Sequence, residues 1–153
     1  RRWPGVRLSL PRRSLGGVAF IGFAADHTHI ALLIPPMAAT VALIVGGPDL
    51  PLAQPRNVIL GHLIGGLIGL ALAVWFGGSI LVGGLAAGLA FGAMLLLRCA
   101  HSPGAATAML LVTIPPEHPP RFLLVLLASA VLVVAAGLVA NRVRRLRYPA
   151  YWW

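Results

Sequence analysis

The chain has 153 residues, of which 59% are hydrophobic and only 10% are charged, and its mean hydropathy is +0.91. A soluble domain of this length carries roughly 25% charged residues and cannot hide so much apolar surface from water. The composition therefore excludes a water-soluble fold and predicts an all-α integral membrane protein.

Every basic residue apart from histidine is an arginine, and the formal net charge is +9. Most of the arginines flank the apolar part of the chain, in the segments 1–13 and 142–153. Basic residues in these positions report membrane topology and contact with anionic lipid headgroups. Because no basic face exists between the two flanks, the pattern excludes nucleic acid as a partner and favours the lipid bilayer.

Four apolar segments are long enough to span a bilayer, which takes about 20 residues of helix. They are 14–34, 57–76, 80–98 and 121–140, and only a tight Gly-Gly-Ser hairpin separates the second from the third. An even number of spans puts both termini on one side, and the positive-inside bias makes that side cytoplasmic. We therefore expect a multi-pass protein of the bacterial inner membrane with two cytoplasmic, arginine-rich flanks.

Two further apolar segments, Pro36–Gly46 and Pro103–Ile114, are too short to span the membrane. Each begins with proline, which suits the first position of a helix, and each stops close to another proline. Irregular backbone at membrane depth is tolerated where it is buried in protein or lines a cavity. These segments therefore predict two re-entrant half-helices that dip into the bilayer from the non-cytoplasmic side.

The two short segments also align with each other at a constant offset of 67 residues and share Pro, two Ala, Thr, Leu and Val. This alignment predicts an internal repeat of span, half-helix and span, over about 14–76 and about 80–141. Because two full spans return the chain to its starting side, the repeats are expected to be parallel rather than inverted.

The starts of the half-helices form the candidate substrate site. A helix N-terminus inside the membrane presents free N–H groups and a positive dipole end, which suits an anion. Thr40 and Thr107 lie one turn into the two half-helices, and Arg98, His101 and Ser102 lead into the second one. Arg98 and His101 would attract a small anion and repel cations. Two alternatives stay open: each threonine only bonds back to its own helix, and Arg98 only reaches the interface.

Asp26 and His29 are three residues apart and share one face of the first predicted span. Ionisable residues inside a span are costly and usually functional, so this pair is expected to form a proton relay or, alternatively, a buried ion pair. His62 has no partner that the sequence identifies, and a structural hydrogen bond is its expected role. The five histidines have no metal-ligand spacing and Cys99 is the one cysteine, so we expect no metal, no cofactor and no disulfide.

Glycines recur every four residues in two of the predicted spans, at Gly61, Gly65 and Gly69 and at Gly84, Gly88 and Gly92. Small residues at this spacing let helices approach closely within a bilayer, either inside one chain or between subunits. A homo-oligomer is the expected assembly. The sequence has no paired carboxylates, catalytic triad or phosphate-binding loop, so it does not indicate an enzyme.

Three motifs occur in the same order as in a known family. Segment 51–57 is followed by Gly61-His62, His101-Ser102-Pro103 precedes a helix that contains Ala and Thr, and segment 141–152 forms an Asn-Arg, Tyr-Pro and Trp tail. This pattern resembles the HPP family of integral membrane proteins, four-span proteins named for a His-Pro-Pro motif. The chain departs from that motif at Ser102, where the family has its middle proline.

Members of the HPP family have been linked to nitrite transport, so the resemblance implies a similar activity here. We therefore expect a transporter or channel for a small monovalent anion such as nitrite, bound near the N-termini of the half-helices. The alternative is a scaffold or assembly subunit in which the half-helices only pack.

Overall fold

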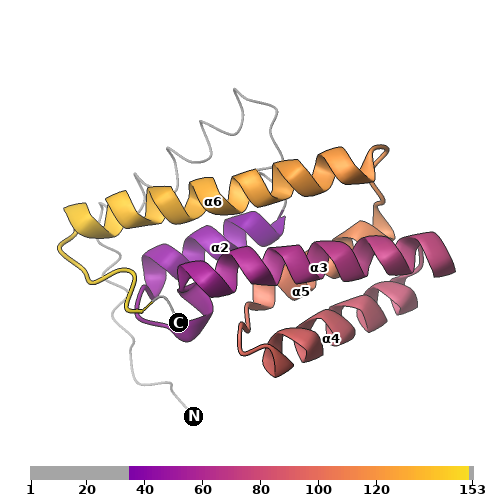
Figure 1. Ribbon diagram of the computed structural model, residues 1–153, viewed down its shortest axis with the longest axis horizontal. Coiled ribbons are helices and arrows are strands. Elements are labelled where there is room, and N and C mark those ends of the chain that lie inside the picture. Colours follow the sequence, from indigo (N-terminus) through magenta and orange to yellow (C-terminus); the bar gives the residue numbers. More distant parts are fainter. Residues whose placement is uncertain (1–34, 152–153) are drawn as a thin grey trace, which may run out of the picture.

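The computed structural model describes residues 35–151, and this part of the chain is entirely helical (Figure 1). The five α-helices are α2 (Pro35–Gly46), α3 (Pro55–Phe76), α4 (Ile80–Leu96), α5 (Ser102–Thr113) and α6 (Pro119–Val143), and a short 3-10 helix, η2 (Pro51–Ala53), precedes α3. The predicted all-α fold is confirmed for these residues. The first predicted span, 14–34, lies outside them, and Asp26 and His29 lie there with it.

Proline, glycine and serine set the helix bounds. α3, α5 and α6 each carry proline within their first two residues, where the missing N–H does not break an intrahelical bond. α3 ends before Gly77, whose φ of 72° is easily adopted only by glycine. Ser79 then caps α4, because its hydroxyl accepts a hydrogen bond from the Val82 N–H at 3.2 Å. The tight hairpin between the second and third predicted spans is confirmed.

Helix length divides the described helices into two groups. α3 and α6 have 22 and 25 residues and are apolar enough to cross a membrane. α4 has 17 residues and ends before the positive-φ residue Arg98, so its helix is only about 25 Å long at a rise of 1.5 Å per residue. α2 and α5 have 12 residues each. Two of the predicted spans therefore reach full length in the part of the chain that the structure describes.

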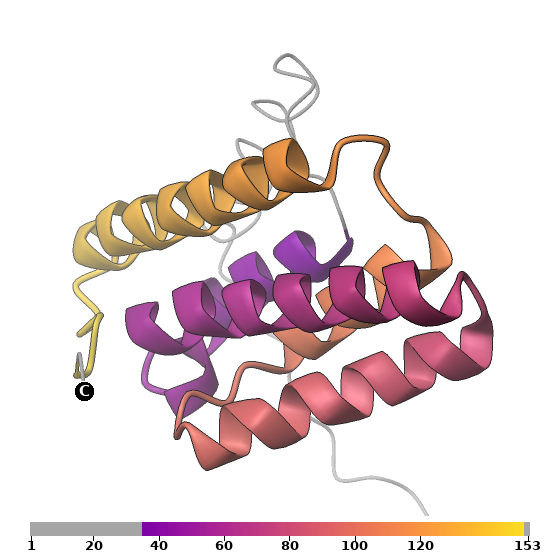
Figure 2. The same ribbon diagram turned by 45° about the vertical axis from the view of Figure 1, so that its right-hand side comes forward.

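α5 lies between α3 and α4 and runs in the same direction as α3 (Figures 1 and 2). A Cβ atom added at Gly61, in the second turn of α3, would meet His101 just before α5. At the other end, a Cβ atom added at Gly83, near the start of α4, would meet Thr113, the last residue of α5. α5 therefore finishes beside the α3–α4 hairpin.

α6 runs opposite to α3, and its last turns meet the end of α2. The Asn141 side-chain amide donates to the Ile44 carbonyl at 3.0 Å. Beyond the helix, the buried Tyr148 hydroxyl donates to the Ala53 carbonyl, also at 3.0 Å. The tail after α6 and the connection 47–54 therefore lie at the same end of the molecule.

We call this end the arginine end, because it gathers most of the arginines of the described chain. The guanidinium of Arg56 donates to the carbonyls of Leu97 and Arg98 at 3.2 and 3.3 Å, which places the connection 97–101 there as well. The opposite end, the hairpin end, contains the connections 77–79 and 114–118 together with Arg121. The arginine end holds six arginines: Arg56, Arg98, Arg142, Arg144, Arg145 and Arg147.

The prediction that the short segment beginning at Pro103 is re-entrant is wrong. The connection 97–101 leaves α4 at the arginine end, but α5 finishes at the hairpin end, so this part of the chain crosses from one end to the other. The short helix α5 can complete this crossing because the connection first enters the protein as non-helical chain. Helix α5 then starts beside Gly61, about 9 Å along α3 at 1.5 Å per residue, and covers the remaining depth.

The predicted parallel arrangement of the two halves is also wrong. α2 runs towards the arginine end and α5 runs away from it, and α3 and α6 likewise run in opposite directions (Figure 1). The helix bounds nevertheless keep the offset of 67 residues, since α2 maps onto α5 at both ends and α3 and α6 end at Phe76 and Val143. α2 ends at the arginine end, and α3 and α4 take the chain to the hairpin end and back, so α5 leaves the arginine end in the direction opposite to α2.

Candidate functional site

Four polar side chains lie together in an apolar interior, and we call them the polar cluster. They are Thr40 of α2, His62 of α3, His101 just before α5 and Thr107 of α5, and each is 0% exposed. They come from three helices and one connection, so only the folded chain brings them together. The same helices contribute buried apolar residues to the core, among them Met37 and Val41 of α2 and Ala108 of α5.

The two threonines occupy equivalent places. α2 and α5 lie against each other, and Ala39 and Ala106 line the same hollow between them. The Thr40 hydroxyl lies 3.0 Å from the Pro36 carbonyl, and the Thr107 hydroxyl lies 3.1 Å from the Pro103 carbonyl. These are the back-bonds expected for threonine inside a helix. Both hydroxyls also reach a histidine, so back-bonding and a role in the cluster occur together.

His62 bridges the two threonines with its two ring nitrogens. Nε2 lies 2.9 Å from the Thr40 hydroxyl, and Nδ1 lies 3.0 Å from the Thr107 hydroxyl. Since the two threonines are related by the offset of 67 residues, His62 sits between equivalent groups of the two halves. This placement is more specific than the structural hydrogen bond predicted for it.

His101 completes the cluster from the other side of Thr40. Its Nε2 lies 3.0 Å from the Thr40 hydroxyl and 3.3 Å from Nε2 of His62. Its Nδ1 lies 2.7 Å from the Leu52 carbonyl, which ties the cluster to η2 at the arginine end. The two imidazole rings meet edge to face, with centroids 4.9 Å apart and an interplanar angle of 66°.

Glycines of α3 and α5 let these two helices approach each other closely around His101. A Cβ atom at Gly61 would lie 2.5 Å from Cβ of His101, so only glycine leaves room for the histidine there. A Cβ atom at Gly65 would overlap the backbone of Gly104, and one at Gly104 would overlap the backbone of Gly61. The predicted glycine stripe of α3 therefore packs inside the chain, against α5, and holds His101 over the α3 backbone.

The structure separates the residues predicted for the substrate site into two groups. Thr40, His101 and Thr107 lie together in the polar cluster. Ser102 is exposed and lines a hollow of about 500 Å³ between α2 and α5, together with Ala39 and Ala106, which directly precede the two threonines. Arg98 is exposed at the arginine end and contributes its carbonyl, not its guanidinium, to the contact with Arg56.

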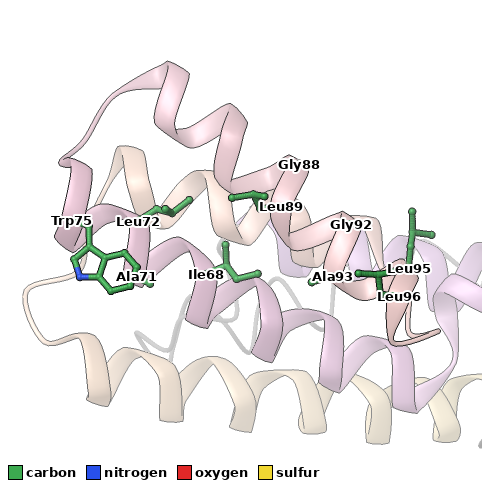
Figure 3. A pocket seen from close by; sticks show the side chains of 10 residues that line it. All are labelled: Ile68, Ala71, Leu72, Trp75, Gly88, Leu89, Gly92, Ala93, Leu95 and Leu96. Atoms are coloured by element: carbon green, nitrogen blue, oxygen red, sulfur yellow. The ribbon is translucent and has the colours of Figure 1, made fainter.

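A larger hollow of about 900 Å³ lies between α3 and α4, and its lining is apolar (Figure 3). Trp75 and Leu72 border it from α3, and Leu89 and Leu96 border it from α4. Because Gly88 and Gly92 have no side chains, α4 projects little into the hollow, which is therefore broad. None of the four cluster residues lines it, and its chemistry suits hydrocarbon rather than an ion.

Comparison with known proteins places the chain in a family. The model of the HPP transmembrane region matches residues 12–149. Two transmembrane proteins of Dictyostelium discoideum are similar to the chain. One is 33% identical over an alignment of 176 positions that covers all of this chain. The other is 35% identical over an alignment of 137 positions that covers 84% of it. The alignments take in 57% and 48% of these relatives, so the chain spans about half of their length. No solved structure matches the chain. The match over nearly the whole sequence shows that the chain belongs to the HPP family of integral membrane proteins.

Proposed function

We propose that this protein transports a small monovalent anion, with nitrite as the first candidate, and that the polar cluster is its binding site. The observation that carries the proposal is the complete burial of two histidines and two threonines that contact one another inside a membrane protein. Polar and ionisable groups inside a membrane are costly, face the protein interior and mark the paths of substrates and ions. A scaffold whose helices only pack would not need them.

We propose that the anion approaches the cluster from the arginine end. Arg56 and Arg98 hold two cationic groups at the arginine end, where the connection 97–101 turns inward. Cationic side chains at a mouth raise the local concentration of anions. The exposed Ser102 hydroxyl lies next in the chain to His101 and lines the hollow between α2 and α5. We propose that Arg98 attracts the anion, and that His101, Thr40 and Thr107 hold it.

The internal symmetry supports a transporter over a scaffold. Many transporters are built from inverted repeats, with the site at the interface between the repeats and formed by broken helices. Here α2 and α5 are short, are related by the 67-residue offset and run in opposite directions, and His62 bridges their equivalent threonines. We propose that the two halves rock against each other around this histidine. The roles of Asp26 and His29 stay predictions.

The arginine end is the proposed cytoplasmic end. Among residues 35–151 it holds six arginines against one, Arg121, at the hairpin end, and short loops rich in arginine stay in the cytoplasm. The assignment keeps the predicted cytoplasmic C-terminus but moves the connection 47–54 to the same side. Placement in a bacterial inner membrane stays a prediction, since the two relatives named above come from an amoeba.

Reporter fusions should place the connection 47–54 and the C-terminus on the same, cytoplasmic side of the membrane. Fusions at Gly78 and at Glu117 should report the opposite side, because both residues lie in connections of the hairpin end. Cysteine accessibility at the same positions, in a Cys99→Ala background, checks that the fusions have not changed the topology. Opposite sides for Pro51 and the C-terminus would contradict the helix directions described above.

Proteoliposomes containing the full chain should take up labelled nitrite faster than empty liposomes, which report the leak of the neutral acid. The variant His101→Asn should reduce the protein-dependent rate at least tenfold. Its amide can still donate to the Leu52 carbonyl but has no atom in the place of Nε2. The exposed His118 provides the control, and His118→Asn should transport like the parent.

Arg98 separates capture of the anion from its binding in the cluster. Arg98→Ala should raise the nitrite concentration needed for half-maximal flux, whereas Arg98→Lys should restore part of the effect because attraction needs only the charge. Flux equal to that of empty liposomes from folded parent protein would favour the scaffold instead.

A further inference from the structure

The polar cluster contains three atoms that face one another and that we call the triangle: the Thr40 hydroxyl oxygen and the two Nε2 atoms of His62 and His101. Its sides measure 2.9, 3.0 and 3.3 Å. All three are hydrogen-bond distances, so the protons of the cluster have to be shared among these atoms. Donors, acceptors and charge together determine how many protons the triangle accommodates.

One proton is placed by the surroundings. The Leu52 carbonyl can only accept a hydrogen bond, so Nδ1 of His101, 2.7 Å away, carries a proton. When this ring is neutral, its Nε2 therefore turns a lone pair into the triangle. The ring is fixed in that state by η2, a part of the fold that does not belong to the cluster.

With both rings neutral, the hydrogen bonds form a single directed chain. The Thr107 hydroxyl donates to Nδ1 of His62, whose Nε2–H donates to the Thr40 hydroxyl, and this hydroxyl donates to Nε2 of His101. The chain ends at the Leu52 carbonyl. Each ring nitrogen has one partner of the right kind, so the neutral cluster is satisfied.

One additional proton is accommodated without leaving a donor unpaired. The two threonines can turn their hydroxyls to the Pro36 and Pro103 carbonyls, at 3.0 and 3.1 Å. Nδ1 of His62 then donates to the Thr107 oxygen, and the extra proton lies on Nε2 of either ring, between that nitrogen and the other corners of the triangle. The back-bond of each threonine is what makes this state possible.

A second additional proton is excluded by charge. The Thr40 oxygen has two lone pairs and could accept from both Nε2 atoms, but both rings would then be positive. Two positive rings would also face each other with centroids 4.9 Å apart, in a buried site where like charges repel strongly. The cluster therefore holds no extra proton or one.

The charge of the added proton is not balanced by the surroundings. α2, α4, α5 and η2 carry no ionisable side chain. The connection between α4 and α5 adds the buried thiol of Cys99. Arg56 of α3 points to the carbonyls of Leu97 and Arg98. Arg121 and Arg142 of α6 are exposed near its ends, and Asp49 and Glu117 are exposed in connections. No carboxylate of residues 35–151 contacts the cluster.

We infer that the triangle binds one proton per chain and that the protein moves its anion together with that proton. This inference rests on the proposed function and names the coupling ion. An isolated buried charge is expensive, and an opposite charge beside it offsets the cost. Proton and anion therefore each strengthen the binding of the other, because the coupling between two ligands is reciprocal. The pair crosses the membrane with no net charge.

The binding of the proton can be tested without transport, by nuclear magnetic resonance of the full chain in nanodiscs with ¹⁵N-labelled histidine. The ring signals of His62 and His101, assigned with His62→Gln and His101→Asn, should shift together and account for one proton between them. Nitrite should move this titration to higher pH, and adding nitrite should leave the signal of His118 unchanged. Two independent protons, or two rings that stay neutral down to pH values where the protein unfolds, would overturn the inference.

The coupling can be tested with the proteoliposomes. With an interior one pH unit more alkaline than the outside, the protein should speed the accumulation of nitrite towards a tenfold ratio, since one proton moves with each anion and a tenfold ratio matches one pH unit. Empty liposomes approach the same ratio more slowly through the neutral acid, so the protein-dependent initial rate is the quantity to measure. A membrane potential alone should produce no accumulation. Protein-dependent nitrite flux that ignores the pH gradient would remove the inference but keep the proposed function. A shared proton in the spectra without any flux would remove the proposed function but keep the proton site.

Discussion

A Gly65→Leu variant should fail to form the native structure, whereas Gly88→Leu should form it. An added Cβ atom at Gly65 overlaps the Gly104 backbone carbonyl of α5, and a backbone cannot turn away as a side chain can. Inserting even small groups into a packed contact costs typically 1–3 kcal/mol. Leucine adds four carbons where one does not fit, so the cost approaches the roughly 5–15 kcal/mol by which proteins are stable.

The matched control is Gly88, which lies in the corresponding stripe of α4. An added Cβ atom there meets nothing within 4 Å, as is also true at Gly84 and Gly92. This open stripe is the face we propose for contact with a second copy of the chain. Gly88→Leu should therefore keep the helical content and thermal stability of the parent but reduce its size in mild detergent to that of a monomer.

Size-exclusion chromatography with light scattering and thermal unfolding distinguish the two effects. Gly65→Leu should aggregate or unfold at least about 10 °C below the parent, because about 2–4 °C is lost per kcal/mol in a protein of this size. A stable, monodisperse Gly65→Leu protein would contradict the close contact of α3 with α5. An unchanged oligomer for Gly88→Leu, or a parent that is already a monomer, would show that the open face of α4 meets only lipid.

Helix bounds were predictable because they depend on local chemistry. Proline at the first turn of α3, α5 and α6, Gly77 after α3 and Ser79 before α4 act through backbone geometry that does not need the rest of the fold. For the same reason, the short segments were recognised from their prolines. α5 begins at Ser102 and α2 is described from Pro35, each one residue earlier than expected.

Helix direction was not predictable in the same way, because apolar composition is the same whichever way a helix runs. The re-entrant and parallel predictions both followed from counting only segments of about 20 residues as crossings. The connection 97–101 is part of a crossing although it is not helical, so that count misses it. Its polar backbone groups find partners inside the protein, for example the Ala100 carbonyl with the Asn57 amide at 3.3 Å, so a crossing need not be helical throughout.

The polar cluster was predictable in part. Thr40, Thr107 and His101 were found because they follow or precede the helix-starting prolines. His62 lies inside the long helix α3, where the sequence does not show which residues of other helices face it. One signal was present, since His62 directly follows Gly61, the glycine over which His101 packs. Arg98 looked similar to His101 from spacing alone, and only the fold shows that one is exposed and the other buried.

Thr40→Val should abolish nitrite transport, whereas Thr113→Val should leave it unchanged. Valine has nearly the shape of threonine, so the substitution removes the hydroxyl and little else. The Thr40 oxygen is the one atom that contacts both Nε2 atoms, at 2.9 and 3.0 Å, and without it the directed chain of hydrogen bonds between the histidines is broken. Thr113 makes the same kind of back-bond, to the Met109 carbonyl at 3.1 Å, but is exposed and far along α5.

The two cluster threonines should differ in a defined way. Thr40→Val should lower the free energy of unfolding by about 1–3 kcal/mol, the cost of leaving a buried polar group unpaired, and should reduce protein-dependent flux to the level of empty liposomes. Thr107→Val removes a partner from only one ring nitrogen, so part of the flux should remain. Thr40→Ser should restore transport, because it returns the hydroxyl. If Thr40→Val folds and transports nitrite like Thr113→Val, the anion and its proton do not pass through the polar cluster.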